Sequence, residues 1–93
     1  MDKKDEISKE ESEKTSRASI VAAMVRERNY QDRKWGNRPH TVGEWLLIME
    51  SELAEAKRGW TEEGGDRRAL EEILQIAAVA MACMEQYGIR EEH

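Results

Sequence analysis

The chain has 93 residues, with 15 Lys and Arg against 20 Asp and Glu, which gives a formal net charge of -5 at pH 7. This acidic balance argues against a protein that holds DNA or RNA on a broad basic face. A chain of this length suits one domain with a modest core, so we expect subunits to associate and bury more apolar surface. The aromatic content is 5% and Phe is absent, which favours a helical core of Leu, Ile, Val, Met and Ala.

The cysteine content and the N-terminus indicate the compartment. Cys83 is the single cysteine, so an intramolecular disulfide is impossible and the reducing cytoplasm is the expected location. The N-terminus is charged where a signal peptide would be apolar. The longest apolar run, from Ile76 to Met84, falls short of the roughly 20 residues that span a bilayer. We therefore expect no membrane partner.

Residues 1–16 are highly charged, and Ile7 is their only buried-type side chain after Met1. Such a segment cannot bury enough apolar surface to offset its ordering entropy, so we predict a loosely ordered extension. The remaining residues, 17–93, are predicted to form a single all-α domain.

The first predicted helix begins after a cap at Ser16 or Ser19 and runs to about Lys34. Its apolar stripe is short, and its later part is strongly charged. We interpret most of these charged side chains as a solvent-exposed face: Arg26, Glu27, Arg28, Asp32, Arg33 and Lys34. The Gly and Pro that follow are expected to end the helix.

The second predicted helix runs from Val42 to about Arg58, starting with a capping box formed by Thr41 and Glu44 and ending at Gly59. A polar turn is expected to follow the second helix.

Asp66 is the predicted cap of the third helix, which continues to Tyr87. From Ile76 to Met84 this helix is apolar on every side, and such helices are usually buried all round. In a chain this short a subunit interface is the simplest way to bury it. The sequence therefore predicts an antiparallel helical bundle that oligomerises.

Four polar side chains fall at positions that the hydrophobic pattern directs inward. Glu52 lies inside the apolar arc of the second helix and Glu55 at its edge, while Glu72 and Gln75 lie among apolar positions of the third. A lone ionised carboxylate on a core-facing surface is costly, so it should be neutralised, paired or bound to a cation. Mg²⁺ or Mn²⁺ would satisfy several at once, since hard cations prefer oxygen ligands. The alternative is pairing with basic neighbours, such as Glu72 with Arg68.

Trp35 stands in the predicted connection beside Lys34 and Arg38. A tryptophan there can stack on a base while the cations meet phosphates, or it can cover the end of the bundle. His40 has no second histidine nearby, so a histidine metal site is not expected.

The spacing Glu52-x-x-Glu55, a loop, then Glu72-x-x-Gln75 resembles the motif of the MazG-like, all-α nucleoside triphosphate pyrophosphohydrolases: ExxE, a spacer, then ExxD. The resemblance covers about residues 20–87. It includes the runs Gln31-Asp32-x-Lys34-Trp35-Gly36 and Trp45-Leu46-Leu47-Ile48, which are similar to short stand-alone members found in phages and mobile elements.

By position, the resemblance implies that Glu52, Glu55 and Glu72 are catalytic and ligate Mg²⁺, with Gln75 at the place of the motif's Asp. The implied reaction hydrolyses a (d)NTP between its α and β phosphates to a (d)NMP and pyrophosphate. The resemblance also implies a homodimer or homotetramer in which helices of two subunits form a four-helix core. The candidate substrate contacts are Trp35 for the base and, for phosphates, Lys34, Arg38, Lys57 and Arg58.

Gln75 departs from the motif, because a neutral amide leaves the four positions with one negative charge fewer. Weaker metal binding, fewer ions, recruitment of Glu71 and loss of catalysis are the alternatives. The competing function is a catalytically inactive helical module that binds nucleotides or another protein. In such an interaction protein each inward acid should meet a basic side chain, whereas in the enzyme the acids should face a solvent-reachable pocket.

Overall fold

The computed structural model describes residues 6–7 and 15–91. These residues form the helices α1 (Arg17–Trp35), α2 (Val42–Arg58) and α3 (Gly65–Tyr87) and the π-helical turn η1 (Gly59–Glu63), and they contain no strand. The predicted all-α class is therefore confirmed for this part of the chain. Most of the predicted N-terminal extension lies outside the described residues.

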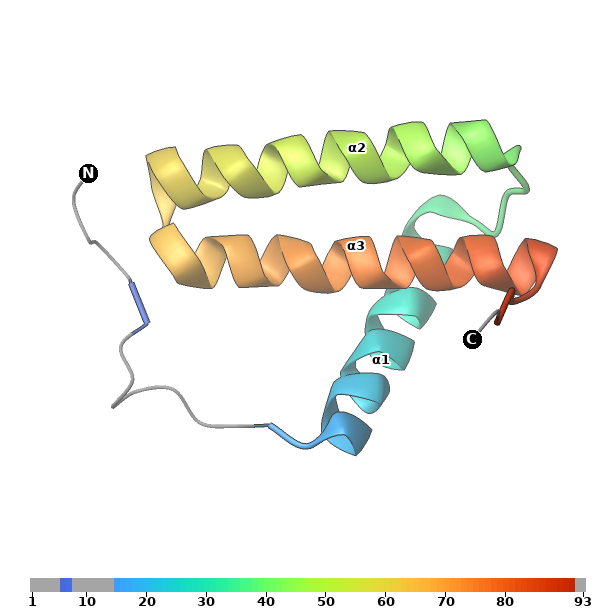
Figure 1. Cartoon of the computed structure of the whole chain (residues 1–93), viewed down its shortest axis with the longest axis horizontal. Coiled ribbons are helices and arrows are strands. Elements are labelled where there is room, and N and C mark those ends of the chain that lie inside the picture. The colour runs from blue at the N-terminus through green and yellow to red at the C-terminus, as the bar shows by residue number, and fades with distance from the viewer. Residues whose placement is uncertain (1–5, 8–14, 92–93) are drawn as a thin grey trace.

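α2 and α3 lie side by side and antiparallel, and α1 crosses α3 at a steep angle (Figure 1). The core lies between α2 and α3, where Trp45 packs with Val79 and Ala82. Ala78, at the centre of α3, is fully buried. Small side chains along α3 allow neighbouring helices to approach closely.

The starts of the first two helices agree with the predictions. The Ser16 hydroxyl accepts a hydrogen bond of 3.1 Å from the Ser19 backbone N–H at the start of α1. At the start of α2, Thr41 Oγ1 accepts from the Glu44 N–H and Glu44 Oε1 accepts from the Thr41 N–H, at 3.1 and 2.8 Å. This reciprocal pair is the predicted capping box. α1 ends before Gly36, whose φ of 80° few other residues adopt.

The connection between α2 and α3 differs from the prediction. Gly59 has right-handed helical angles, so the chain continues into η1 instead of forming a polar turn. The Thr61 hydroxyl donates to the backbone carbonyl of Lys57 at 3.0 Å, which satisfies a carbonyl at the end of α2. α2 itself ends at Arg58 with Gly59 as its C-cap, as predicted.

Asp66 does not cap α3, contrary to the prediction, since the cap position is Gly64 and has no side-chain hydrogen bond. Asp66 instead accepts from the Ile7 backbone N–H at 2.7 Å and from Trp60 Nε1 at 2.8 Å. These two hydrogen bonds, that from Ile7 first, lower the pKa of Asp66. The carboxylate therefore joins η1 and residue 7 to the start of α3.

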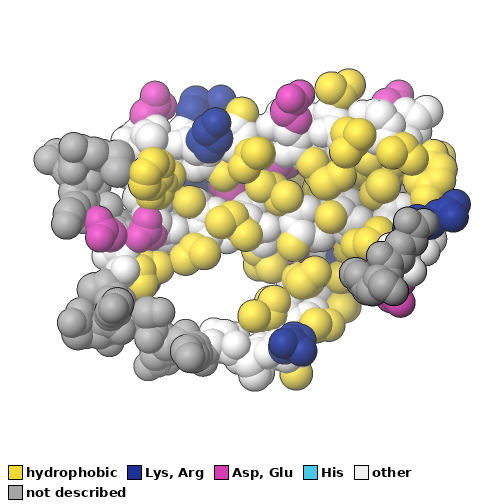
Figure 2. Space-filling view, viewed as in Figure 1, with side chains coloured by type: hydrophobic (Ala, Val, Ile, Leu, Met, Phe, Trp, Pro, Cys, Tyr) yellow, Lys and Arg dark blue, Asp and Glu magenta, His cyan; other side chains and the backbone are white. Residues whose placement is uncertain are grey.

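Much of the apolar surface stays exposed in the single chain. Leu46 and Leu47 on α2 are 59% and 65% exposed, and Figure 2 shows hydrophobic side chains gathered over α2 and along α3. The run from Ile76 to Met84 is only partly buried, since Met84 itself is 45% exposed. No helix within residues 6–7 and 15–91 is long and apolar enough to cross a bilayer.

Candidate functional site

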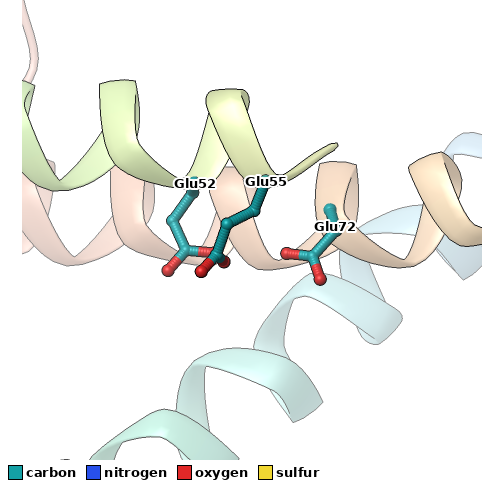
Figure 3. Close-up of side chains that lie close together, drawn as sticks. All are labelled: Glu52, Glu55 and Glu72. Carbon is teal, nitrogen blue, oxygen red and sulfur yellow. The ribbon is translucent and has the colours of Figure 1, made fainter. Parts of the chain in front are cut away.

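The structure brings three of the predicted site residues together. Glu52 and Glu55 lie one turn apart on α2, and Glu72 reaches them from α3. One oxygen from each carboxylate lies within 4.8 Å of the others. Figure 3 shows the three side chains converging on the side where α1 passes. Gln75, the fourth predicted position, is half-buried one turn after Glu72.

The three carboxylates differ in their exposure. Glu72 is 4% exposed, Glu52 is half-buried and Glu55 is exposed. One oxygen of Glu52 and one of Glu72, Oε2 in each, is buried and accepts no hydrogen bond from the described residues. A buried carboxylate oxygen without a donor is costly, so this group favours a proton or a cation at that point.

The electrostatic environment of Glu52 is unfavourable for its charge. Burial raises the pKa of Glu52, and the negative charges of Glu55, Glu72 and Glu27 raise it further. Glu55 belongs to α2, Glu72 to α3 and Glu27 to α1, so the packing of the three helices concentrates the negative charge. The arrangement therefore has the properties expected of a site for positive charge.

Arg68 neutralises part of this charge. Its Nη2 lies 3.2 Å from Glu72 Oε1, and its Nη1 lies 3.1 Å from Glu71 Oε1. Gly59 makes room for this side chain, because a Cβ at that position would lie 2.7 Å from Arg68 Cγ. The predicted pairing with Arg68 is thus present for one oxygen of Glu72, while the other oxygen accepts no hydrogen bond within the described part of the chain.

A cavity of about 540 Å³ lies beside the carboxylates, with Glu52 in its wall. Three of the five predicted substrate contacts line it: Lys34, Trp35 and Arg38. Lys34 Nζ lies 4.8 Å from the centre of the Trp35 ring, close enough for a cation–π interaction. The other two, Lys57 and Arg58, are exposed at the end of α2 and are not among the described residues that line this cavity.

Arg28, which we expected on a solvent-exposed face, is only 6% exposed and lines the cavity. Its Nε and Nη2 donate to the two carboxylate oxygens of Glu85 at 2.9 and 3.1 Å, and its Nη1 donates to Asp32. Burial alone would lower the pKa of Arg28, but the hydrogen bonds to the two acids outweigh it and raise the pKa. The prediction was wrong here because the Arg28 guanidinium joins α1 to α3.

Gln31 is a second buried polar residue of α1, 7% exposed. Its Nε2 donates to the backbone carbonyl of Gln75 at 3.2 Å. The apolar stripe of α1 does not make the buried contact with α3, since Ile20 and Val25 are 46% and 43% exposed. The sequence offered one indirect signal for this contact. The later half of α1 has too few apolar side chains to pack on another helix, so polar side chains must make the contact.

The loop before α2 is fastened to the end of α3. Gln86 donates to the His40 carbonyl at 2.7 Å and accepts from the His40 N–H at 3.1 Å. Its Oε1 also accepts from Trp45 Nε1 at 3.0 Å, and the Tyr87 hydroxyl donates to the His40 carbonyl at 2.7 Å. These hydrogen bonds position Trp45 and His40 in the wall of the cavity.

The site therefore combines a partly buried acidic group, a neighbouring cavity lined by Arg28, Lys34 and Arg38, and an exposed tryptophan that also lines the cavity. Such a combination suits a ligand that carries negative charge and binds together with a cation. The chain matches no family model, and comparison with curated proteins and with solved structures likewise gave no match.

Proposed function

We propose that the protein is a Mg²⁺-dependent nucleoside triphosphate pyrophosphohydrolase, which converts a (d)NTP and water to a (d)NMP and pyrophosphate. The observation that carries the proposal is the buried Oε2 of Glu72, which accepts no hydrogen bond from the described residues and lies in the group with Glu52 and Glu55. The spacing of these acids, which resembles the MazG-like motif, supports the same function.

The residues present fit a hard divalent cation. Glu52, Glu55 and Glu72 would hold it, because each offers an oxygen within 4.8 Å of the others. Gln75 follows Glu72 by one turn of α3 and adds an amide oxygen in the same region of the helix. A cation there would also relieve the cost of the two buried oxygens.

The chain's own residues would bind and orient the substrate. Lys34 and Arg38 would contact the phosphates, and Trp35 would contact the base, because all three line the cavity next to Glu52. Bound Mg²⁺ would neutralise phosphate oxygens and lower the pKa of a water molecule. A carboxylate of the group would orient that water and accept its proton through an oxygen that does not bind the cation.

The proposal includes a homodimer or homotetramer that acts in the cytoplasm. Leu46, Leu47 and Leu53 on α2 are more than half exposed, and such a surface in a short chain is best covered by a second subunit. A partner helix pair packed there would complete a four-helix core.

The ion pair between Arg68 and Glu72 favours a second function, a catalytically inactive helical module that binds a nucleotide or a protein. In that case the neutral Gln75 and the Arg68 guanidinium would together remove the need for a cation.

An assay of the purified chain with each common (d)NTP and Mg²⁺ separates the two functions. The enzyme should release a monophosphate and pyrophosphate, and Glu52→Gln and Glu72→Gln should each abolish the release. Glu50→Gln is the matched control, because Glu50 is exposed on the same helix and outside the carboxylate group. Cleavage that persists in the first two variants would contradict the proposed site.

A further inference from the structure

α1 carries an acid next to the carboxylate group. Glu27 is half-buried, and after burial and the charges of Glu55 and Glu72 its charge also raises the pKa of Glu52. Glu27 belongs to α1, a different helix from those that carry Glu52, Glu55 and Glu72. The sequence alone had placed Glu27 on the solvent-exposed face of α1.

A buried amide ties this acid to the third helix. Gln31 Nε2 lies 3.4 Å from Glu27 Oε2 and donates at 3.2 Å to the backbone carbonyl of Gln75. Because Gln31 is 7% exposed and follows Glu27 by one turn, it fixes the Glu27 side chain on the face of α1 that meets α3. Glu27 is thus held toward the stretch of α3 that includes Glu72 and Gln75.

Gln75 leaves the site short of one negative charge, and the structure shows which acid is available to replace it. The Glu71 side chain is 65% exposed and already pairs with Arg68. Glu27 Oε2 lies 3.4 Å from Gln31 Nε2, which also donates to the backbone carbonyl of Gln75, the position where the acid is absent. Glu72, 4% exposed, has one oxygen that no described residue satisfies, which points to a ligand between these helices.

We propose that Glu27 supplies, from α1, the fourth carboxylate of a divalent-cation site formed with Glu52, Glu55 and Glu72, in place of the acid that is absent at position 75. The inference rests on the cation site of the proposed function. It also makes cation binding depend on the packing of α1 against α3, because the fourth carboxylate belongs to a helix that contributes none of the other three.

The test is a titration of the full chain with Mn²⁺, followed by electron paramagnetic resonance of the free ion. Glu27→Gln should weaken Mn²⁺ binding by at least about 10- to 100-fold, because that is the loss typical of groups that only support a metal ligand and Glu27 is proposed as a ligand itself. Glu50→Gln removes the same charge from an exposed position and should leave Mn²⁺ binding unchanged. Far-ultraviolet circular dichroism of each variant confirms that the helices remain.

A second variant separates a role at the cation from a purely structural role. In the Glu27→Gln background, Gln75→Asp should restore Mn²⁺ binding, because it returns the missing charge to the site from α3. If Glu27 only held α1 in place, Gln75→Asp would strengthen Mn²⁺ binding by the same factor in the Glu27→Gln chain as in the unmodified chain, and the inference would be wrong.

The possible failures are distinguishable. If Glu52→Gln and Glu72→Gln lose Mn²⁺ binding while Glu27→Gln binds like the unmodified chain, the cation site stands and the role of Glu27 is refuted. If the unmodified chain binds no Mn²⁺ at all, the cation site of the proposed function fails, and the inference fails with it.

Discussion

Glu52 of α2 and Glu72 of α3 lie in one carboxylate group, and each has a buried Oε2 that accepts no hydrogen bond from the described residues. Two acids held this way repel each other and are poorly solvated, so their ionised forms cost stability unless positive charge is supplied. The fold tolerates the arrangement with partial relief from Arg68, which reaches the other oxygen of Glu72. Destabilised charge of this kind is typical of functional sites.

Removing one charge should therefore stabilise the protein in the absence of a cation. We expect Glu52→Gln to raise the free energy of unfolding by about 1 kcal/mol, since it removes repulsion and provides an amide donor. For a domain of this size that corresponds to a rise of about 4–8 °C in Tm. Differential scanning fluorimetry in a chelating buffer measures it.

Mg²⁺ should reverse the order of stability. It should raise the Tm of the unmodified chain and leave Glu52→Gln nearly unchanged, because a ligand that binds only the folded state stabilises it. Glu50→Gln should respond like the unmodified chain. Equal responses of all three proteins to Mg²⁺ would rule out a cation at Glu52.

The raised pKa of Glu52 predicts how stability depends on pH without a divalent cation. The folded state holds the Glu52 proton above the ordinary pKa of 4.5, whereas the unfolded state releases it there. The folded state therefore binds more protons in this range, and the contribution of Glu52 to stability falls as pH rises from 4.5 through its folded-state pKa. Urea unfolding of the unmodified chain and Glu52→Gln should show a difference that grows with pH and then levels off. A difference independent of pH would contradict the assignment.

The Arg28 ion pairs predict a large effect of a residue that the sequence placed at the surface. Arg28→Ala should lower the free energy of unfolding by about 2 kcal/mol, because it removes charge-assisted hydrogen bonds to Asp32 within α1 and to Glu85, which joins α1 to α3. Arg26→Ala, on the exposed side of the same helix, should change it by less than about 0.5 kcal/mol. Urea unfolding of both variants gives the comparison. Equal losses would show that Arg28 holds no special place in the fold.

The exposed leucines of α2 predict an assembly that a single charge can disrupt. Leu47 is 65% exposed in the single chain, so Leu47→Glu places a carboxylate at the surface of α2. Burying that charge in an interface between subunits would be costly. Light scattering coupled to size-exclusion chromatography should show monomers for this variant and dimers or tetramers for the unmodified chain. Ile89→Glu, at a site 67% exposed beyond the end of α3, should leave the assembly intact. A monomeric unmodified chain would remove the basis for the four-helix core.

Local signals in the sequence predicted the helices well. The caps at Ser16 and Thr41 depend on side chains within three residues of the backbone groups they satisfy, so the pattern alone was enough. The inward placement of Glu52 and Glu72 followed from helical periodicity, which also governs the real packing.

Long-range contacts were beyond the sequence. Asp is a common helix-capping residue, but the Asp66 carboxylate accepts hydrogen bonds from the Ile7 backbone N–H and from Trp60 Nε1 instead. Arg28, Gln31 and Glu27 look like surface residues because their partners are separated from them by the rest of the chain. The cavity likewise forms only when the helices are packed. Lys34, Trp35 and Arg38 line it, whereas Lys57 and Arg58 are not among the described residues that do.

The most direct test of the central claim is phosphorus-31 nuclear magnetic resonance of a (d)NTP incubated with the purified chain and Mg²⁺, run beside Glu72→Gln. The account predicts that the triphosphate signals are replaced by those of a nucleoside monophosphate and pyrophosphate, and that the variant produces neither. The account would be contradicted if every common (d)NTP stayed intact, or if the products were a nucleoside diphosphate and orthophosphate.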